Sequence, residues 1–236
     1  MYKRQSIGAG AAGVLNMWWD KELDNVMERT RGRPLPNEKI SSDDAFVFGV
    51  TLSIFSVMFL GLAANWLAAF LLAITIFFYL VVYSIFLKKT TPQNIVIGGA
   101  AGAMPPLIGW VASTEIISVE PILLFLLIFL WTPPHFWSLA IITKDDYARA
   151  NIPMFPVFYG VERTRRSILH YTVVLIICSQ IIAFTQIGGP LFFLLSNALN
   201  AVLLLSAIKL VSYKENNGFE RERRFFKFTI LYLFLY

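Results

Sequence analysis

Charged residues and cysteines are scarce in this chain of 236 residues. Only 15% of the residues are charged, against about 25% in a typical soluble domain, and the mean hydropathy is +0.63. These values exclude a soluble globular protein and indicate an integral membrane protein. The single cysteine, Cys178, excludes an intrachain disulfide, and its place inside an apolar run predicts a small core residue.

Six apolar runs are long enough to cross a bilayer as helices, which takes roughly 20 residues each. They cover residues 45–64, 66–87, 94–114, 121–143, 168–187 and 190–211. Shorter apolar runs lie near the two ends, at 6–19 and 225–236. Because backbone groups inside a bilayer need helical partners, a helix should not stop halfway. The sequence therefore predicts an all-α polytopic membrane protein that is truncated at both ends.

The first five residues, MYKRQ, match the translation of a sequencing adaptor. We interpret residues 1–5 as a probable cloning or sequencing scar and residues 6–236 as a single, partial transmembrane domain. The alternative is a signal peptide that begins at Lys3 and Arg4, but no secreted domain follows it.

The basic residues are absent from every second boundary between apolar runs. Of the 20 lysines and arginines, the 18 other than Lys3 and Arg4 lie at or near four alternate boundaries. Such a pattern places the basic loops on the cytoplasmic side of the cell (plasma or inner) membrane. The net charge of +5 is divided among short loops, which argues against a nucleic-acid partner.

The first charged loop, NMWWDKELDNVMERTRGRPLP, begins with three polar residues spaced four apart, Asn16, Asp20 and Asp24. This spacing puts them on one face of a helix. Mg²⁺ is usually held by one or two carboxylates together with substrate phosphates, and arginines such as Arg29 and Arg33 match phosphate geometry. The pattern predicts a metal–diphosphate site at the end of a membrane helix. The alternative is a polar helix end with orienting arginines.

A second charged loop, TKDDYARANIPMFPVFYGVERTRRS, lies on the same predicted side. Its adjacent acids, Asp145 and Asp146, would add carboxylates to the first cluster. The alternative is that they cap a helix or pair with Lys144. Lys88, in a third loop, is either a phosphate ligand or an orientation anchor.

Small residues and prolines mark the segment GGAAGAMPPLIGW. Gly98, Gly99 and Gly102 predict close helix packing, since small residues let backbones approach. Pro105 and Pro106 predict a break or kink that would open room for a large ligand.

His135 follows Pro133 and Pro134 in the segment WTPPHFWSLAI, inside a predicted span. Ionisable residues within membrane spans are functional candidates. A histidine beside prolines and aromatic rings suits three roles: a ligand of haem iron, a base, or a partner of a freed backbone carbonyl. The residues alone leave the three open.

Four segments together resemble a known family in order and spacing: NMWWDKELDNVMERTRGRPLP, YSIFLKKTTPQNIVIGGAAGAMPPLIGW, WTPPHFWSLAI and KDDYARANIPMFPV. Over residues 6–236 the chain resembles the haem O synthases, a branch of the UbiA-type intramembrane prenyltransferases. N-x-x-x-D-x-x-x-D marks the superfamily, while TPQNIVIGG and WTPPHFW point to the haem branch. The resemblance implies a bundle of nine helices around a central cavity, here present from the end of the second helix to the start of the ninth.

The resemblance implies an Mg²⁺-dependent prenyltransferase that moves the farnesyl group of farnesyl diphosphate to a vinyl group of haem B. The products would be diphosphate and haem O, an intermediate for terminal oxidases. Haem B is then a substrate and Mg²⁺ the cofactor. The lipid bilayer and a downstream haem A synthase or oxidase assembly would be further partners.

The resemblance also implies roles for the residues singled out above. The catalytic set is Asn16, Asp20, Asp24, Asp145 and Asp146, with the four aspartates as metal ligands, and the substrate-binding set is Arg29, Arg33, Lys88, Lys144, Arg149 and His135. One departure concerns the second acidic motif, which is commonly D-x-x-x-D in the superfamily. Here Arg149 stands four residues after Asp145, and an adjacent acidic pair takes the motif's place.

Two other functions remain compatible with these residues. The first is a UbiA-type enzyme that prenylates a quinone or another aromatic acceptor. The second is a transporter, although transporters place charged sites near the bilayer midplane and these acids cluster at one face.

Overall fold

The computed structural model describes residues 2–212 and 218–236, with side chains from Ser6 onward. Met1 and the side chains of residues 2–5 lie outside this part, so the scar interpretation stays a prediction. All regular elements in the described ranges are helices, which confirms the all-α prediction. They are α1 (Tyr2–Trp19), α2 (Lys21–Val26), α3 (Ser42–Ala63), α4 (Trp66–Phe77), η1 (Phe78–Leu87), α5 (Lys88–Thr90), α6 (Asn94–Thr114), α7 (Val119–Ile142), α8 (Lys144–Arg149), α9 (Phe155–Tyr159), α10 (Val161–Ala183), α11 (Pro190–Ser212) and α12 (Glu220–Leu235).

Six helices of the described chain are long and apolar enough to cross a membrane, as predicted. They are α3, the continuous helix from Trp66 to Thr90, α6, α7, α10 and α11. The main difference is in α10, which begins at Val161 rather than 168. The polar stretch VERTRRS continues this helix beyond its apolar part, and Gly160, with a φ of 82°, precedes its first turn.

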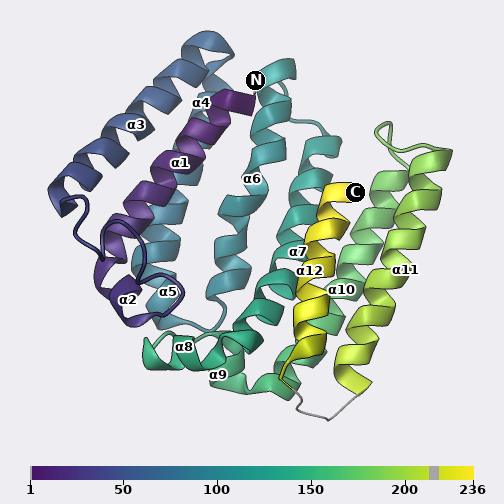
Figure 1. The fold of residues 1–236 in the computed structure, drawn as a ribbon. Helices are drawn as coiled ribbons and strands as arrows, with labels where there is room; N and C mark the ends of the chain where they lie inside the picture. Colours follow the sequence, from purple (N-terminus) through teal and green to yellow (C-terminus); the bar gives the residue numbers. More distant parts are fainter. Residues whose placement is uncertain (1, 213–217) are drawn as a thin grey trace.

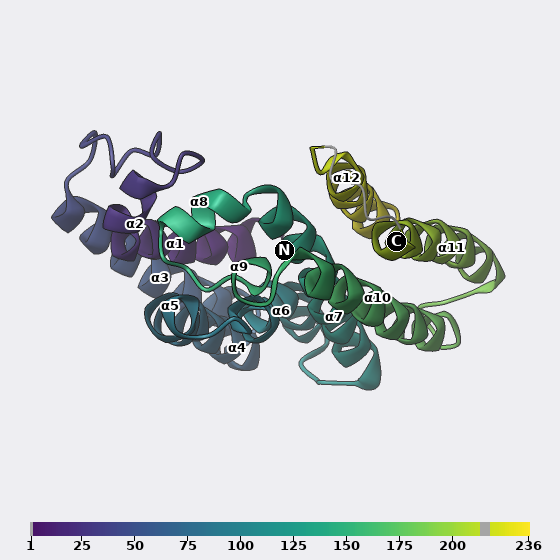
Figure 2. The same cartoon turned by 90° about the horizontal axis from the view of Figure 1, so that it is seen from below.

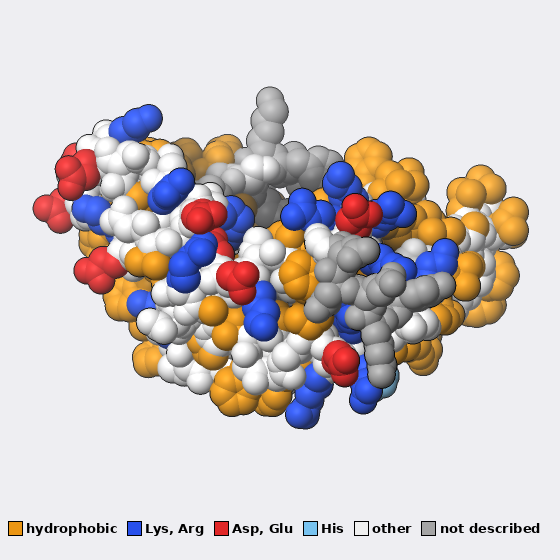
Figure 3. Space-filling model, turned by 60° about the horizontal axis from the view of Figure 1, so that its bottom comes forward, with side chains coloured by type: hydrophobic (Ala, Val, Ile, Leu, Met, Phe, Trp, Pro, Cys, Tyr) orange, Lys and Arg blue, Asp and Glu red, His pale blue; other side chains and the backbone are white. Residues whose placement is uncertain are grey.

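The long helices stand side by side in a curved row (Figures 1 and 2). α6 packs on α7 in the middle of the row, α1, α3 and α4 lie on the α6 side, and α10, α11 and α12 lie on the α7 side. The short helices α2, α5, α8 and α9 gather at the bottom of Figure 1. Figure 3 shows basic and acidic side chains collected on this face, with apolar side chains along the flanks. The fold thus joins loops distant in sequence at one charged end.

The proline pairs do not interrupt their helices. α6 is continuous through Pro105 and Pro106, and α7 is continuous through Pro133 and Pro134. Of the expected break or kink in α6, the break is therefore wrong, and the kink stays a prediction. Membrane helices tolerate prolines because neighbouring helices and local adjustments compensate for the lost backbone hydrogen bonds.

The glycines of α6 differ in their surroundings. A Cβ atom on Gly98 would lie 2.2 Å from Tyr83 Cδ2, and one on Gly99 would lie 2.9 Å from Thr132 Cγ2, so close packing is confirmed at both. At Gly102 the prediction is wrong, because a Cβ there would meet no atom within 4 Å. Gly102 instead lines a cavity.

The span from Trp66 to Thr90 contains an element that the sequence did not predict, the π-helix η1. Within it the Ser84 hydroxyl donates to the Tyr79 carbonyl, five residues earlier, at 2.9 Å. π-Helical turns widen a helix and occur frequently at functional sites. Here η1 turns Tyr79 and Tyr83 toward the cavity described below.

An ion pair fixes the start of α12 to α10. The Arg165 guanidinium donates from Nε to Glu222 Oε1 at 2.7 Å, and its second nitrogen lies 2.6 Å from the same oxygen. Both residues are buried, with exposed fractions of 8% and 1%. Removing one partner from a buried pair leaves the other charge uncompensated.

We predict that Glu222→Leu lowers the free energy of unfolding by about 3–5 kcal/mol, measured by thermal or chemical denaturation in detergent. The double variant Arg165→Met, Glu222→Leu should recover most of this loss, because it removes both charges. Glu220→Leu is the matched control, since the Glu220–Arg224 pair is exposed and contributes little. Equal losses in the Glu222 and Glu220 variants would contradict the structural role of the buried pair.

Candidate active site

The polar stripe at the end of α1 continues into α2. Asp20 separates the two helices, and its backbone N–H still donates to the Asn16 carbonyl at 2.9 Å, while the Asp24 N–H donates to the Asp20 carbonyl at 2.7 Å. The four-residue spacing is therefore kept through the junction. All three side chains are buried, with exposed fractions of 8%, 2% and 2% in chain order.

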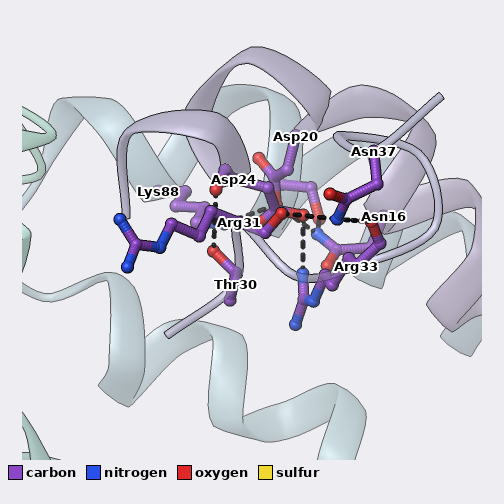
Figure 4. Close-up of polar contacts among 9 residues, drawn as sticks. Asn16, Asp20, Asp24, Thr30, Arg31, Arg33, Asn37 and Lys88 are labelled. Carbon is purple, nitrogen blue, oxygen red and sulfur yellow. Dashed lines mark hydrogen bonds and ion pairs between the residues drawn. The ribbon is translucent and has the colours of Figure 1, made fainter. Parts of the chain in front are cut away.

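Each carboxylate of the stripe is paired with a cation from another segment (Figure 4). Asp20 Oδ2 forms an ion pair with Lys88 of α5. Asp24 Oδ2 lies 2.8 Å from the Arg33 guanidinium, which belongs to the loop after α2. Asn16 donates from Nδ2 to Asp20 Oδ2 at 2.8 Å and to the Ser84 hydroxyl at 2.9 Å. The stripe thus draws three segments together at one point.

One oxygen of the stripe has no partner. Asp20 Oδ1 is buried and forms no hydrogen bond in the described structure. Oxygen atoms of carboxylates and amides are the ligands that Mg²⁺ prefers, and Mg²⁺ usually takes its remaining ligands from phosphates and water. The described residues form no group of three or more His, Cys, Asp or Glu that could hold a metal without help. The stripe fits a cation that arrives with a phosphate-bearing substrate.

The second acidic pair is divided between two places. Asp146 is buried, and its Oδ1 accepts hydrogen bonds from the Glu28 N–H at 3.0 Å and from Arg149 at 3.1 Å. Arg149 also lies 3.2 Å from Glu28 Oε1. Asp145 is exposed and lines a separate polar cavity of about 310 Å³, together with Lys144.

The environment of Asp146 keeps its side chain ionised. Burial acts to raise the pKa of this carboxyl, but hydrogen bonds from the Glu28 amide and from Arg149 outweigh it and hold the pKa below its ordinary value. The charged Asp146 therefore fastens α8 to the loop that carries the arginines of the first motif.

A cavity of about 360 Å³ opens beside the stripe. Its polar end is lined by Asn16, Asp24, Arg29, Arg33 and Lys88. Its apolar part lies between η1, α6 and α7, with Tyr79, Tyr83, Gly102, Trp131 and Phe136 among the lining residues. This volume is within the range of small-molecule sites, and the division into a cationic end and an aromatic end suits an amphipathic ligand.

Several lining residues were not singled out in the sequence. Tyr79 and Tyr83 look like ordinary aromatic residues of a membrane span, and only the π-helical turn directs them to the cavity. Tyr147 follows the acidic pair directly, and its position beside Asp146 is the one signal that points to it.

His135 lies at the contact of α7 with α12 and is not among the residues that line the cavity, although its neighbours Trp131 and Phe136 are. Its ring stacks between Trp131 and Phe226, at centroid distances of 4.2 and 4.6 Å, and its Nδ1 lies 2.8 Å from Thr229 Oγ1. The partner is a hydroxyl group rather than a carbonyl freed by the prolines. Nδ1 therefore does not bind a freed carbonyl. The roles as an iron ligand and as a base stay predictions.

Comparison with protein families identifies the chain. The model of the UbiA prenyltransferase family matches residues 6–231. Protoheme IX farnesyltransferase of Ruegeria sp. (strain TM1040) is 51% identical over 235 residues, which are 98% of this chain and 75% of that protein. The protein of the same name from Paracoccus denitrificans (strain Pd 1222) is 50% identical, over 98% of this chain and 77% of its own length.

Solved structures agree with this result at the level of the fold. A UbiA homolog from Archaeoglobus fulgidus bound to DMAPP and Mg²⁺ superposes with a TM-score of 0.71 at 16% identity, covering 100% of this chain and 86% of that one. The same homolog bound to GPP and Mg²⁺ gives a TM-score of 0.65 at 15% identity, covering 100% and 87%. The chain belongs to the UbiA prenyltransferase family.

Proposed function

We propose that this protein is a haem O synthase, which joins the farnesyl group of farnesyl diphosphate to a vinyl group of haem B. The observation that carries the proposal is the buried stripe of Asn16, Asp20 and Asp24, of which Asn16 and Asp24 line the cationic end of a cavity whose other end is aromatic. Relatives that are about half identical over nearly the whole chain are protoheme IX farnesyltransferases, which supports haem B as the acceptor.

In this proposal Asn16, Asp20 and Asp24 hold Mg²⁺, and the unpartnered Asp20 Oδ1 is a ready ligand. When bound, the cation supplies positive charge to the diphosphate as it leaves. The second metal expected at Asp145 and Asp146 stays a prediction. Asp145 lines a different cavity, and Asp146 accepts a hydrogen bond from the first loop, so the two carboxylates do not converge on the stripe.

The cations of the cavity act on the leaving group. Arg29, Arg33 and Lys88 line its polar end, where negative charge develops on the diphosphate as the C–O bond breaks. Arginine is suited to contact two phosphate oxygens at once. Arg149 would act indirectly, by holding the loop through Asp146. Lys144 lines the other cavity, so its predicted substrate contact is not part of this arrangement.

The aromatic walls serve the carbon chemistry. Loss of diphosphate leaves an allylic cation at the first carbon of the farnesyl group, and the faces of Tyr79, Tyr83 and Trp131 attract positive charge. Their bulk also keeps water away until the vinyl carbon has formed the new C–C bond. The remaining carbon of the vinyl group then takes hydroxide from water, which releases a proton and gives the hydroxyethyl group.

His135 is the residue that we propose to contact haem. The Thr229 hydroxyl donates its one proton to the Phe226 carbonyl at 2.6 Å, so its contact with His135 requires a proton on Nδ1. A neutral ring then presents an unprotonated Nε2. This is the form of histidine that ligates iron, and a fixed partner on the other nitrogen is the usual support of such a ligand.

The orientation is also part of the proposal. The charged face of Figure 3 would lie in the cytoplasm, on the inner side of the plasma membrane, because it carries the basic loops. The diphosphate product would then leave to the cytoplasm, and the diphosphate group of the donor would enter from the same side.

The carboxylates are the first test. We expect Asp20→Asn and Asp24→Asn each to lower farnesyl transfer by about 10²-fold or more, since each change removes charge where the metal–diphosphate must be stabilised. The assay is mass spectrometry of haems extracted from membranes supplied with haem B, farnesyl diphosphate and Mg²⁺. Asp43→Asn is the charge-matched control, because Asp43 is exposed on α3. Full activity of an Asp20→Asn, Asp24→Asn double variant would refute the metal assignment, and prenylation of an added quinone precursor in place of haem would refute the acceptor.

Haem binding is the second test, read by absorbance titration of haem B in detergent. We predict that His135→Ala weakens haem affinity strongly and that Thr229→Val weakens it about 10-fold, because partners of metal-ligating histidines matter at this level. Asp20→Asn should leave the affinity unchanged. An unaltered dissociation constant in His135→Ala would remove haem contact from this residue.

Orientation is the third test. A cysteine placed at Lys39 should react with a membrane-impermeant maleimide only from the cytoplasmic side, and a cysteine at Ile117 only from the opposite side. Both positions are exposed, whereas the native Cys178 is buried and should give little background. The reverse labelling pattern would overturn the assigned topology.

A further inference from the structure

A second cavity, of about 220 Å³, adjoins the first. The two share Tyr79 and Gly102 as lining residues. The second is lined almost entirely by apolar and small residues, among them Gly8, Ala12, Gly13, Leu72 and Ile108. Thr75 also lines it, but its hydroxyl donates to the Leu71 carbonyl at 2.7 Å and is thereby satisfied. Apart from Tyr79, which it shares with the first cavity, the second cavity is therefore apolar and suits a hydrocarbon chain.

The second cavity continues the first along α1, α6 and the span formed by α4 and η1. On α1 the first cavity is lined by Asn16 and the second by residues from Gly13 back to Gly8. Twelve residues separate Asp20 from Gly8, which corresponds to about 18 Å along the helix. This distance is comparable to the length of an extended chain of three isoprene units that starts at a diphosphate beside Asp20.

Two glycines keep this path open. A Cβ atom on Gly13 or on Gly102 would meet no atom within 4 Å, so a side chain there would project into free space that belongs to the cavity. The far end lies where α1 contacts α4. A Cβ on Gly8 would lie 2.8 Å from Leu72 Cδ1, which marks contact between α1 and α4.

We propose that the second cavity holds the terminal isoprene units of the prenyl donor and that Gly102 and Gly13 determine the donor length that the protein accepts. The proposal rests on the proposed function for the position of the diphosphate. Gly102 lies at the junction of the two cavities, and a larger residue there closes the second cavity while leaving the stripe and its cations untouched. Leu72, at the far wall, limits the length from the other end.

The test measures donor binding by itself, while transfer is measured by the mass spectrometry of haems described above. Unreactive thiolodiphosphate analogues of geranyl, farnesyl and geranylgeranyl diphosphate are titrated with Mg²⁺ by calorimetry. We expect Gly102→Leu and Gly13→Leu to weaken the farnesyl analogue at least tenfold and the geranyl analogue less than threefold, since a misfit methylene costs tenfold or more in an apolar pocket. Gly109→Leu is the matched control. It lies on the same helix, also has open space at its Cβ, and lines neither cavity, so it should change neither affinity.

The second variant lengthens the cavity instead of closing it. Leu72→Ala should raise the affinity for the geranylgeranyl analogue relative to the farnesyl analogue by a few-fold or more. An increase in affinity also serves as a control for stability, because a variant that is only destabilised would not bind the longer analogue more tightly.

The outcomes separate this proposal from the function itself. Equal loss of all three analogues in Gly102→Leu, or no change in any of them, would overturn the proposal. A change confined to co-purified lipid acyl chains would overturn it too, by assigning the cavity to lipid. If the length-selective changes occur but haem B receives no prenyl group, the cavity assignment stands and the acceptor is wrong.

Discussion

Two carboxylates buried where α1 meets α2 are the constraint on which the rest of the site depends. Asp20 and Asp24 are each 2% exposed, and a buried charge is costly unless it is paired. The pairing partners come from α5 and from the loop after α2, so neutralising the acids also fixes these segments. Asp146 extends the same principle, since its hydrogen bonds hold that loop against α8.

This charged cluster stands at one end of a cavity whose other end is aromatic, and the proposed function depends on this contrast. A diphosphate needs cations and a metal, whereas an allylic cation needs aromatic faces and the absence of water. The π-helix η1 serves both needs, because it brings Ser84 to Asn16 and directs Tyr79 and Tyr83 to the cavity. The length of the bundle beyond these tyrosines leaves room for a hydrocarbon tail between α1, α4 and α6.

Much of the fold could be predicted from the sequence because a bilayer leaves few choices. Apolar runs of sufficient length must be helices, and the alternation of basic loops predicts which helix ends lie on the same side of the membrane. The stripe of Asn16, Asp20 and Asp24 was predictable from helical spacing, which is kept although Asp20 separates α1 from α2. The family resemblance is likewise confirmed.

The rest depended on contacts between helices, which local patterns do not contain. Gly102 has the same sequence signature as Gly98 and Gly99, yet it faces a cavity and they face side chains. Asp145 and Asp146 are neighbours in sequence but point to different surroundings, because consecutive residues of a helix diverge. The sequence around Pro105 does not indicate whether neighbouring helices compensate for the backbone hydrogen bond that a proline cannot donate.

The most direct test of the central claim is an anomalous-diffraction map of crystals that contain Mn²⁺, as a substitute for Mg²⁺, and the farnesyl thiolodiphosphate analogue. The account predicts a metal peak about 2.1 Å from an oxygen of Asp20 or Asp24, with the diphosphate toward Arg33 and Lys88. A metal bound only by Asp145 and Asp146, or a diphosphate bound away from the Asn16–Asp24 stripe, would contradict it.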